Sequence, residues 1–149
     1  MRKAVRAVVI RNEHVLLMYR NKFGQEYYSL VGGGIRMGED PVDALKREVF
    51  EETSLEVANP ILVIVEDAGE IFGTQYIYVC DYAGGEIGLL PESEEAKITA
   101  MGQNLYEPVW LPLSDLPSVN LLPKKLQQTL IEHLAHGWEA TPIALTISD

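Results

Sequence analysis

The sequence predicts a single α+β domain, residues 1–149, in which helices pack against a mixed β-sheet. Two observations lead to this prediction. Runs of β-branched and aromatic residues are separated by two segments whose apolar residues recur at helical spacing, in the order strands, helix, strands, helix. That order suits helices lying on the faces of a sheet. The composition, with 47% hydrophobic and 23% charged residues in 149, is sufficient for one sizeable core.

The N-terminal part of the chain is predicted to form strands. Ala4 to Ile10 and Val15 to Tyr19 are apolar runs on either side of a short polar break, so we expect a hairpin. Tyr27 to Val31 is a further short strand. The glycines Gly32 to Gly34 follow, and a glycine triplet on its own is more often a loop.

The same N-terminal segment bears on the location of the protein. Its basic start and apolar continuation are typical of a signal peptide, but Arg6 and the polar residues 11–14 interrupt the apolar stretch. No apolar run reaches the roughly 20 residues of a membrane helix. We therefore expect a first strand, a cytoplasmic protein and no membrane partner.

The clearest helix is predicted to begin after Asp40. This residue can accept a hydrogen bond as N-cap, and Pro41 suits the first helical position because its missing N–H would be unpaired there. The apolar face of the helix comprises Val42, Leu45 and Val49. We expect the helix to end near Thr53–Ser54.

The middle of the chain is again predicted to be β-rich. Leu55 to Glu66 has β character with a break at Asn59–Pro60, and Gln75 to Tyr82 is a strong strand. Residues 83–104 are rich in glycine and then in acidic residues, so we expect a mobile loop there.

The C-terminal part should contain one strand and one helix. Pro108 to Leu111 predicts the strand, and the apolar spacing over Lys124 to His136 predicts the helix. No structure is assigned to residues 140–149. The apolar stretch from Pro142 to Ile147 could serve an interface, which makes a homodimer a hypothesis.

The charge and cysteine content exclude some functions. The net charge of −10 argues against binding a nucleic-acid polymer, which requires clustered Lys and Arg. It does not exclude a nucleotide-like small molecule, because a divalent cation can bridge an acidic site to phosphate. The lone Cys80 cannot form an internal disulfide and is interpreted as a buried thiol.

Three carboxylates cluster near the end of the predicted helix. Glu48, Glu51 and Glu52 stand at i, i+3 and i+4 and are therefore neighbours on one face. A Glu-rich helix is usually a solvated face, but here a glycine triplet that can approach an anion precedes it. A bound Mg²⁺ or Mn²⁺ would remove the repulsion among the carboxylates. The combination predicts a site for a metal-bound polyphosphate.

The spacing of these residues resembles the box of the Nudix hydrolase family, G-x5-E-x7-R-E-U-x-E-E-x-G-U, in which U is a bulky aliphatic residue. Gly33 opens the box, Glu39 and Arg47 follow at the required intervals, and Leu55 closes it. Every defined position matches except one, where Ser54 replaces the usual Gly. The replaced glycine lies where a helix ends in a left-handed conformation, so we expect Ser54 to reduce stability rather than to remove a ligand.

The resemblance implies an α/β/α sandwich and a set of metal ligands. Glu48, Glu51 and Glu52 would bind Mg²⁺ (or Mn²⁺), helped by a backbone carbonyl near Gly32. Three further residues would support the site: Gly33 through close backbone approach, Glu39 at the turn into the helix, and Arg47 through an ion pair with a box glutamate.

The implied reaction is hydrolysis of a phosphoanhydride bond in a nucleoside diphosphate linked to another moiety. Water would attack phosphorus, with the metal lowering the pKa of that water. Glu48 or Glu52 is expected to be the general base. The alternative is a glutamate outside the box, and the candidates are Glu92, Glu94, Glu95 and Glu107.

The box says little about the rest of the substrate. Arg20 could contact a phosphate, and Tyr27 or Tyr28 could stack on a base, although one of the two tyrosines should point into the core. A nucleoside triphosphate, oxidised or not, is the leading substrate. ADP-ribose, a nucleotide sugar and a dinucleoside polyphosphate remain open.

Two other functions are compatible with the same fold. A non-catalytic nucleotide-binding regulatory module would tend to lose box carboxylates, whereas all of them are present here. An isomerase acting on an isoprenoid diphosphate would need a reactive cysteine, and Cys80 lies inside a predicted strand. Both considerations favour the hydrolase.

Overall fold

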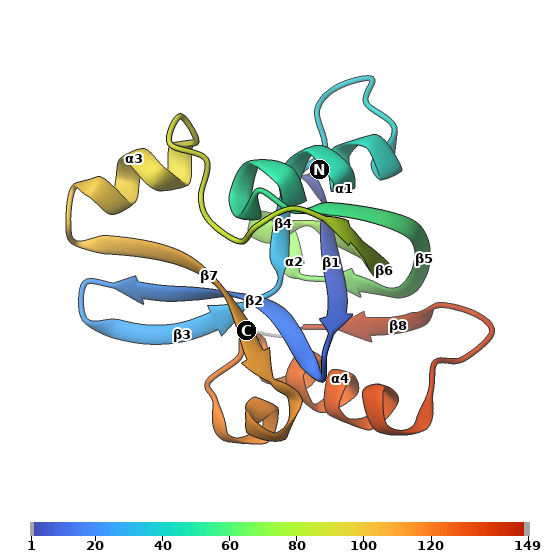
Figure 1. The fold of residues 1–149 in the computed structure, drawn as a ribbon. Coiled ribbons are helices and arrows are strands. Elements are labelled where there is room, and N and C mark those ends of the chain that lie inside the picture. The colour runs from blue at the N-terminus through green and yellow to red at the C-terminus, as the bar shows by residue number, and fades with distance from the viewer. Residues whose placement is uncertain (1, 148–149) are drawn as a thin grey trace.

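The computed structural model describes residues 2–147 and has an α+β architecture, as predicted (Figure 1). The strands are β1 (Lys3–Arg11), β2 (His14–Lys22), β3 (Gln25–Ser29), β4 (Val31–Gly34), β5 (Glu56–Asp67), β6 (Thr74–Gly84), β7 (Asn104–Pro112) and β8 (Ile143–Thr146). The helices are α1 (Pro41–Thr53), α2 (Gly69–Phe72), α3 (Glu94–Ala100) and α4 (Lys124–His136), with a 3-10 helix at Leu113–Ser118. The last residues of the predicted tail, 148–149, lie outside the described part.

The predicted hairpin of β1 and β2 exists, but its two strands separate soon after the turn. They pair at Ile10–Val15 and Arg11–His14. Beyond that point β1 pairs in parallel with β6 and antiparallel with β4, whereas β2 pairs with β3 and β7. Figure 1 shows β2, β3 and β7 running away from β1. The strands thus form two parts of a mixed sheet that diverge from the turn between β1 and β2.

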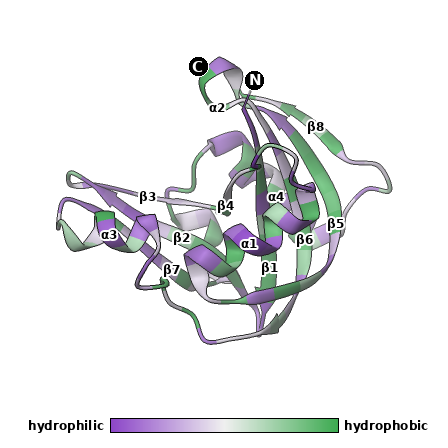
Figure 2. Ribbon diagram, turned by 90° about the horizontal axis from the view of Figure 1, so that it is seen from above, coloured by the Kyte–Doolittle hydropathy of each residue, from purple (hydrophilic) through white to green (hydrophobic). Residues whose placement is uncertain are grey.

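Apolar residues fill both faces of the β1–β6–β5 part of the sheet. Odd-numbered residues of β1, such as Val5, pack with Leu45 and Val49 of α1, and Val8 packs with Leu130 of α4 on the other face. Alternation along a strand sends neighbouring side chains to opposite faces. In Figure 2 both hydropathy colours alternate along α1, as expected for a helix with one apolar face. The two helices therefore enclose the sheet in the predicted α/β/α sandwich.

The glycine triplet is part of a strand, which corrects the expectation of a loop. Two strands, β3 and β4, replace the single strand predicted over residues 27–31. Gly32 pairs with Arg6 of β1 at a φ of 145°, and a Cβ there would collide with the carbonyl oxygen of Val5. Only glycine allows this close pairing, so the triplet brings the backbone against β1.

Two further expectations are corrected in the C-terminal half. Residues 83–104 contain the helix α3, for which Ser93 is the N-cap and accepts a hydrogen bond from the Ala96 N–H. The unassigned tail contributes β8, which pairs in parallel with β5. Both elements are short, so their local sequence signal is weak.

The helix α2 was not predicted, and β7 begins at Asn104 rather than at the predicted Pro108, whereas α1, α4 and the long strands β5 and β6 lie where they were expected. Helix α1 begins after Asp40, whose side chain accepts from the Val42 N–H, and the break at Asn59 is a register shift in β5. In the described part of the chain, none of the helices is long and apolar enough to cross a bilayer.

Candidate active site

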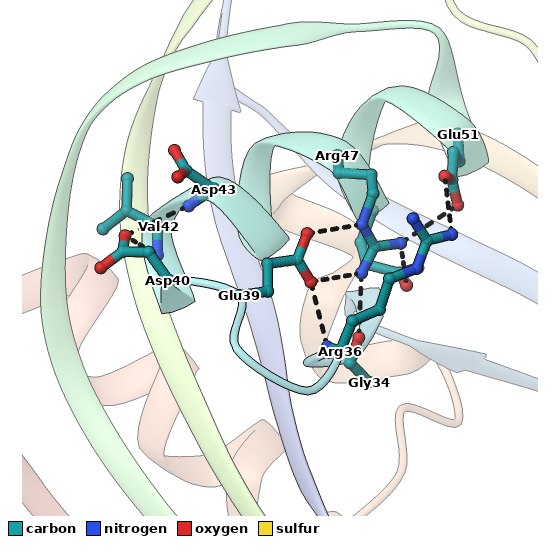
Figure 3. Close-up of polar contacts among 9 residues, drawn as sticks. Gly34, Arg36, Glu39, Asp40, Val42, Asp43, Arg47 and Glu51 are labelled. Carbon is teal, nitrogen blue, oxygen red and sulfur yellow. Dashed lines mark hydrogen bonds and ion pairs between the residues drawn. The ribbon is translucent and has the colours of Figure 1, made fainter.

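Arg47 on α1 holds the turn before the helix against the helix itself (Figure 3). Its Nε and Nη2 donate to the two carboxylate oxygens of Glu39 at 2.8 and 2.9 Å, and Nη2 also donates to the Gly34 carbonyl at 3.1 Å. Nη1 donates to Glu48 at 2.8 Å. The hydrogen bonds from Arg47, together with one from the Arg36 N–H, lower the pKa of Glu39 to about 2. These contacts fit the supporting roles expected for Glu39 and Arg47.

Glu52 is the most deeply buried of the box carboxylates. Glu52 is only 6% exposed, and its Oε1 accepts a hydrogen bond from the Gly32 N–H at 2.7 Å. Burial raises the pKa of Glu52 to about 8, although the Gly32 N–H and the nearby Arg6 oppose this rise. Without a cation, burial therefore favours the protonated form of Glu52, and a divalent cation bound there would displace that proton.

Glu48 and Glu51 occupy different environments. Burial raises the pKa of Glu48, opposed by Arg47, and its carboxylate lies against Gly33, where a Cβ would collide with it. Glu51 is paired with Arg47 at 3.4 Å and with Arg36 at 3.8 Å. Glu48 lines the same cleft as Glu52, whereas Glu51 is outside the lining.

The geometry of these groups decides whether they suit a divalent cation. No group of three or more His, Cys, Asp or Glu side chains in the described part of the chain is arranged to hold a metal ion. Glu48, Glu52 and the Gly32 backbone nevertheless line one wall of the cleft and supply oxygen donors, the type that Mg²⁺ and Mn²⁺ prefer. Two partly buried carboxylates with raised pKa values are stabilised by such a cation. The oxygen donors of the cleft therefore fit a divalent cation. Glu51 lies outside the cleft lining and is paired with Arg36 and Arg47.

The cleft has a volume of about 860 Å³ and separates the β1 face from strands β2 and β3. Its charged and amide side chains are those of Arg2, Arg6, Arg20, Glu48, Glu52, Glu66, Gln75, Glu94 and Glu95. A cleft that contains both carboxylates and arginines suits a substrate whose phosphates reach the site with a cation.

Both side chains predicted to bind substrate line this cleft. The guanidinium of Arg20 lies 3.6 Å from the ring centroid of Tyr106 and 5.4 Å from that of Tyr27. It also donates to the Asn104 side chain at 2.5 Å and to the Leu105 carbonyl at 3.3 Å. Tyr28 packs against the core on the α4 side, as expected for one of two adjacent residues in a strand.

The four alternative general bases separate into two groups. Glu94 and Glu95 on α3 line the cleft, and Glu95 is near enough to raise the pKa of Glu52. Glu92 and Glu107 are outside the lining. The unexpected helix α3 therefore brings two of these candidates to the site.

Sequence reasoning missed several polar residues of the cleft, among them Arg6, Glu66, Gln75 and Tyr106. The first three lie in strands at positions where the apolar alternation predicts an inward-facing side chain. A charged residue at an inward-facing position of a strand indicates a specific role, since charged side chains are rarely fully buried without a partner. Arg6, between Ala4 and Val8, was the most visible case.

Curated relatives of this chain include several hydrolases. It is 26% identical over 136 residues to an NAD-capped RNA hydrolase, NudC, from Haemophilus influenzae, covering 84% of this chain and 46% of the relative. It is 32% identical over 111 residues to the NudC of Pseudomonas putida, covering 74% of this chain and 36% of the relative. The chain thus spans less than half of the length of these relatives.

Solved structures share the fold. A MutT protein from Bacillus halodurans superposes with a TM-score of 0.67 at 18% identity, covering 99% of this chain and 91% of the other. A NUDIX hydrolase from Nitrosomonas europaea gives a TM-score of 0.73 at 16% identity, covering 99% and 79%. The family model described as the NUDIX domain matches residues 1–135. The chain therefore belongs to the NUDIX hydrolase family.

Proposed function

We propose that this protein hydrolyses a phosphoanhydride bond in a nucleoside diphosphate linked to another moiety, with Mg²⁺ or Mn²⁺ as cofactor and a nucleoside triphosphate as the leading substrate. The observation that carries the proposal is the meeting of Glu48, Glu52 and the Gly32 backbone with Arg20 and Tyr27 in one cleft. Oxygen donors for a cation thereby face groups that suit phosphate and base.

The residues of the box would have different roles. Glu48 and Glu52 would bind the cation, and Arg47 would keep the Glu48 carboxylate in place. A cation bound there supplies positive charge that acidifies water and neutralises charge on the phosphates. The carboxylate that accepts the proton from water would be Glu48 or Glu52, and Glu94 or Glu95 would be the alternative from α3.

A regulatory module that binds nucleotide without cutting it is the main competing function. All of the box carboxylates are present, which favours the enzyme, because a module that only binds nucleotide does not require the buried Glu52. An isomerase that uses the cysteine is disfavoured for a different reason. Cys80 is buried in the core on the α1 side, and burial raises the pKa of its thiol to about 12, so it is an inert group.

The names of the relatives widen the set of substrates to test. The curated relatives are named as hydrolases of NAD-capped RNA, and one structural neighbour is named as an ADP-ribose pyrophosphatase. With a net charge of −10, this chain is a poor match to an RNA backbone. The small nucleotides NAD⁺ and ADP-ribose therefore join the set of substrates to test, and the RNA does not.

A substrate panel tests the proposal. Nucleoside triphosphates, oxidised nucleoside triphosphates, ADP-ribose, nucleotide sugars, dinucleoside polyphosphates and NAD⁺ are incubated with the protein in Mg²⁺ or in EDTA. We expect at least one of them to yield a nucleoside monophosphate in Mg²⁺ only. If a nucleotide binds but none is cut, the regulatory module replaces the hydrolase.

A further inference from the structure

We propose that Glu66 and Arg6 recognise the base of the substrate and select guanine. The inference rests on the proposed function, because it names the base of the nucleotide that the box would cut. Neither residue belongs to the box. Their placement in the same cleft as Glu52 is what connects them to the substrate.

The first observation is an unpaired buried carboxylate. Glu66 is 3% exposed and lines the cleft. In the described part of the chain, its Oε2 is the one buried side-chain nitrogen or oxygen without a hydrogen-bond partner. A buried acceptor without a donor destabilises a fold, so native proteins keep few of them. A ligand that donates a hydrogen bond to Oε2 would explain why Glu66 is present at this position.

The second observation is a free donor on the same face of the sheet. Glu66 lies opposite Gln75, and Arg6 lies opposite Ile77, which is two residues further along the same strand. Side chains two apart share a face. The Nε of Arg6 donates to Gln75 at 3.1 Å, and its Nη1 donates to backbone carbonyls. Within residues 2–147 this leaves Nη2 of Arg6 as a donor for a ligand.

These groups match the Watson–Crick edge of guanine. A carboxylate only accepts hydrogen bonds and a guanidinium only donates them. Guanine presents a ring N–H and an amino group side by side, which suit the two oxygens of Glu66, and its carbonyl suits Arg6. Adenine and cytosine present one amino group beside an acceptor nitrogen. Hypoxanthine lacks the amino group altogether.

The surroundings of the pair suit a flat base next to a diphosphate. Phe72, Ile77 and Leu126 provide apolar surface in the cleft. On the other side, Arg6 donates to the Gly32 carbonyl at 3.2 Å, and Gly32 donates to Glu52. Arg6 therefore links the proposed position of the base to the Gly32 backbone, which lies at the expected metal position.

Binding of nucleoside monophosphates to the metal-free protein tests the proposal without any hydrolysis. Titration calorimetry would compare guanosine, inosine and adenosine 5′-monophosphates, of which the second differs from the first only by the amino group. We expect the guanosine compound to bind about tenfold or more tightly than either of the others, the effect of a hydrogen bond to a charged group.

Substitution of Glu66 gives the matched comparison. In Glu66→Gln the preference for guanosine over inosine monophosphate should fall to within about twofold. Glu56→Gln removes the same charge from an exposed position of the same strand and should keep the full preference. The Glu66→Gln protein should also unfold at the same or a higher temperature than wild type, because an unpaired carboxylate is removed; a glutamate with a structural role would give a lower temperature.

Two results would overturn the inference: equal binding of guanosine and inosine monophosphates by wild type, or an unchanged preference in Glu66→Gln. The wild-type comparison decides the matter even if the variant fails to fold. Hydrolysis is scored separately. Selective guanine binding without cutting of any guanine nucleotide in Mg²⁺ would contradict the proposed function alone, whereas cutting without guanine selectivity would contradict this inference alone.

Discussion

Glu52 combines burial, a short hydrogen bond to the Gly32 N–H and a pKa raised to about 8. Because the folded protein binds this proton more tightly than the unfolded chain does, Glu52 favours folding at low pH. That contribution is complete below the unfolded value of 4.5 and is lost as the pH rises to about 8. A bound cation would restore part of it by replacing the proton.

The first prediction concerns this loss in the metal-free protein. Urea unfolding in EDTA, measured from pH 5 to 8.5, should show the free energy of unfolding falling with pH. Compared with wild type, Glu52→Gln should remove a slope of up to about 1.4 kcal/mol per pH unit. Glu48 and Glu66, whose pKa values are also raised, remain in both proteins, so the difference between the two slopes reports the loss of Glu52 together with its coupling to Glu48. Parallel curves for the two proteins would contradict the assignment.

At the scale of elements, the turn between β4 and α1 depends on Arg47. Its guanidinium contacts Glu39 and the Gly34 carbonyl (Figure 3) and also Glu48, so one side chain joins the strand, the turn and the helix. A lysine ammonium is a point charge and cannot reproduce the forked contact with Glu39.

The second prediction is that Arg47→Lys lowers the free energy of unfolding by about 1–3 kcal/mol. The same replacement at Arg36, whose side chain is 67% exposed, should change it by less than about 0.5 kcal/mol. Chemical unfolding of the two variants measures both values. Equal effects at the two positions would mean that Arg47 is an ordinary surface arginine.

The end of α1 explains why Ser54 is tolerated at a glycine position. Ser54 has a φ of 65°, the left-handed conformation for which glycine is favoured. Its hydroxyl, however, donates to the Gly88 carbonyl at 2.7 Å, a bond that glycine could not make. The conformational penalty and the hydrogen bond are each about 1 kcal/mol and so nearly cancel.

The third prediction follows from this balance. Ser54→Gly should leave the free energy of unfolding within about 0.5 kcal/mol of wild type, whereas Ser54→Ala should lower it by about 1 kcal/mol. Thermal or chemical unfolding of the pair distinguishes the two effects. A clear gain in stability from Ser54→Gly would show that the hydroxyl contributes nothing.

At the scale of the whole molecule, the cleft exists because β1 and β2 separate after their turn. The β1 side carries Glu66, Gln75 and Arg6, the β2 and β3 side carries Arg20 and Tyr27, and α1 brings its glutamates to the same space. A ligand that bridges these parts should stabilise the fold as a unit.

The fourth prediction is that Mg²⁺ or Mn²⁺ stabilises the wild-type protein, by about 2.7 kcal/mol at a concentration one hundred times the dissociation constant. The double variant Glu48→Gln/Glu52→Gln should lose this stabilisation, and Glu132→Gln, an exposed glutamate on α4, should keep it. Thermal unfolding with and without the cation measures the difference. Equal stabilisation of the double variant would place the cation elsewhere.

How far the sequence predicts this molecule depends on the range of the interactions. Helix α1 and the spacing of its glutamates are set by local capping and periodicity, and they were predicted correctly. The strand formed by the glycine triplet and the tail strand β8 depend on pairing with distant segments, which local propensity does not contain. Glu66 was missed because one charged residue in an apolar run reveals its partners only in three dimensions.

Hydrolysis by wild type and by Glu52→Gln, with Glu132→Gln as the charge-matched control, tests the central claim most directly. The best substrate of the panel is incubated in Mg²⁺ and the nucleoside monophosphate released is quantified. We expect Glu132→Gln to match wild type and Glu52→Gln to lose at least about a hundredfold, roughly 2.7 kcal/mol of transition-state stabilisation. A folded Glu52→Gln protein with wild-type activity would contradict the assignment of the box as the catalytic centre.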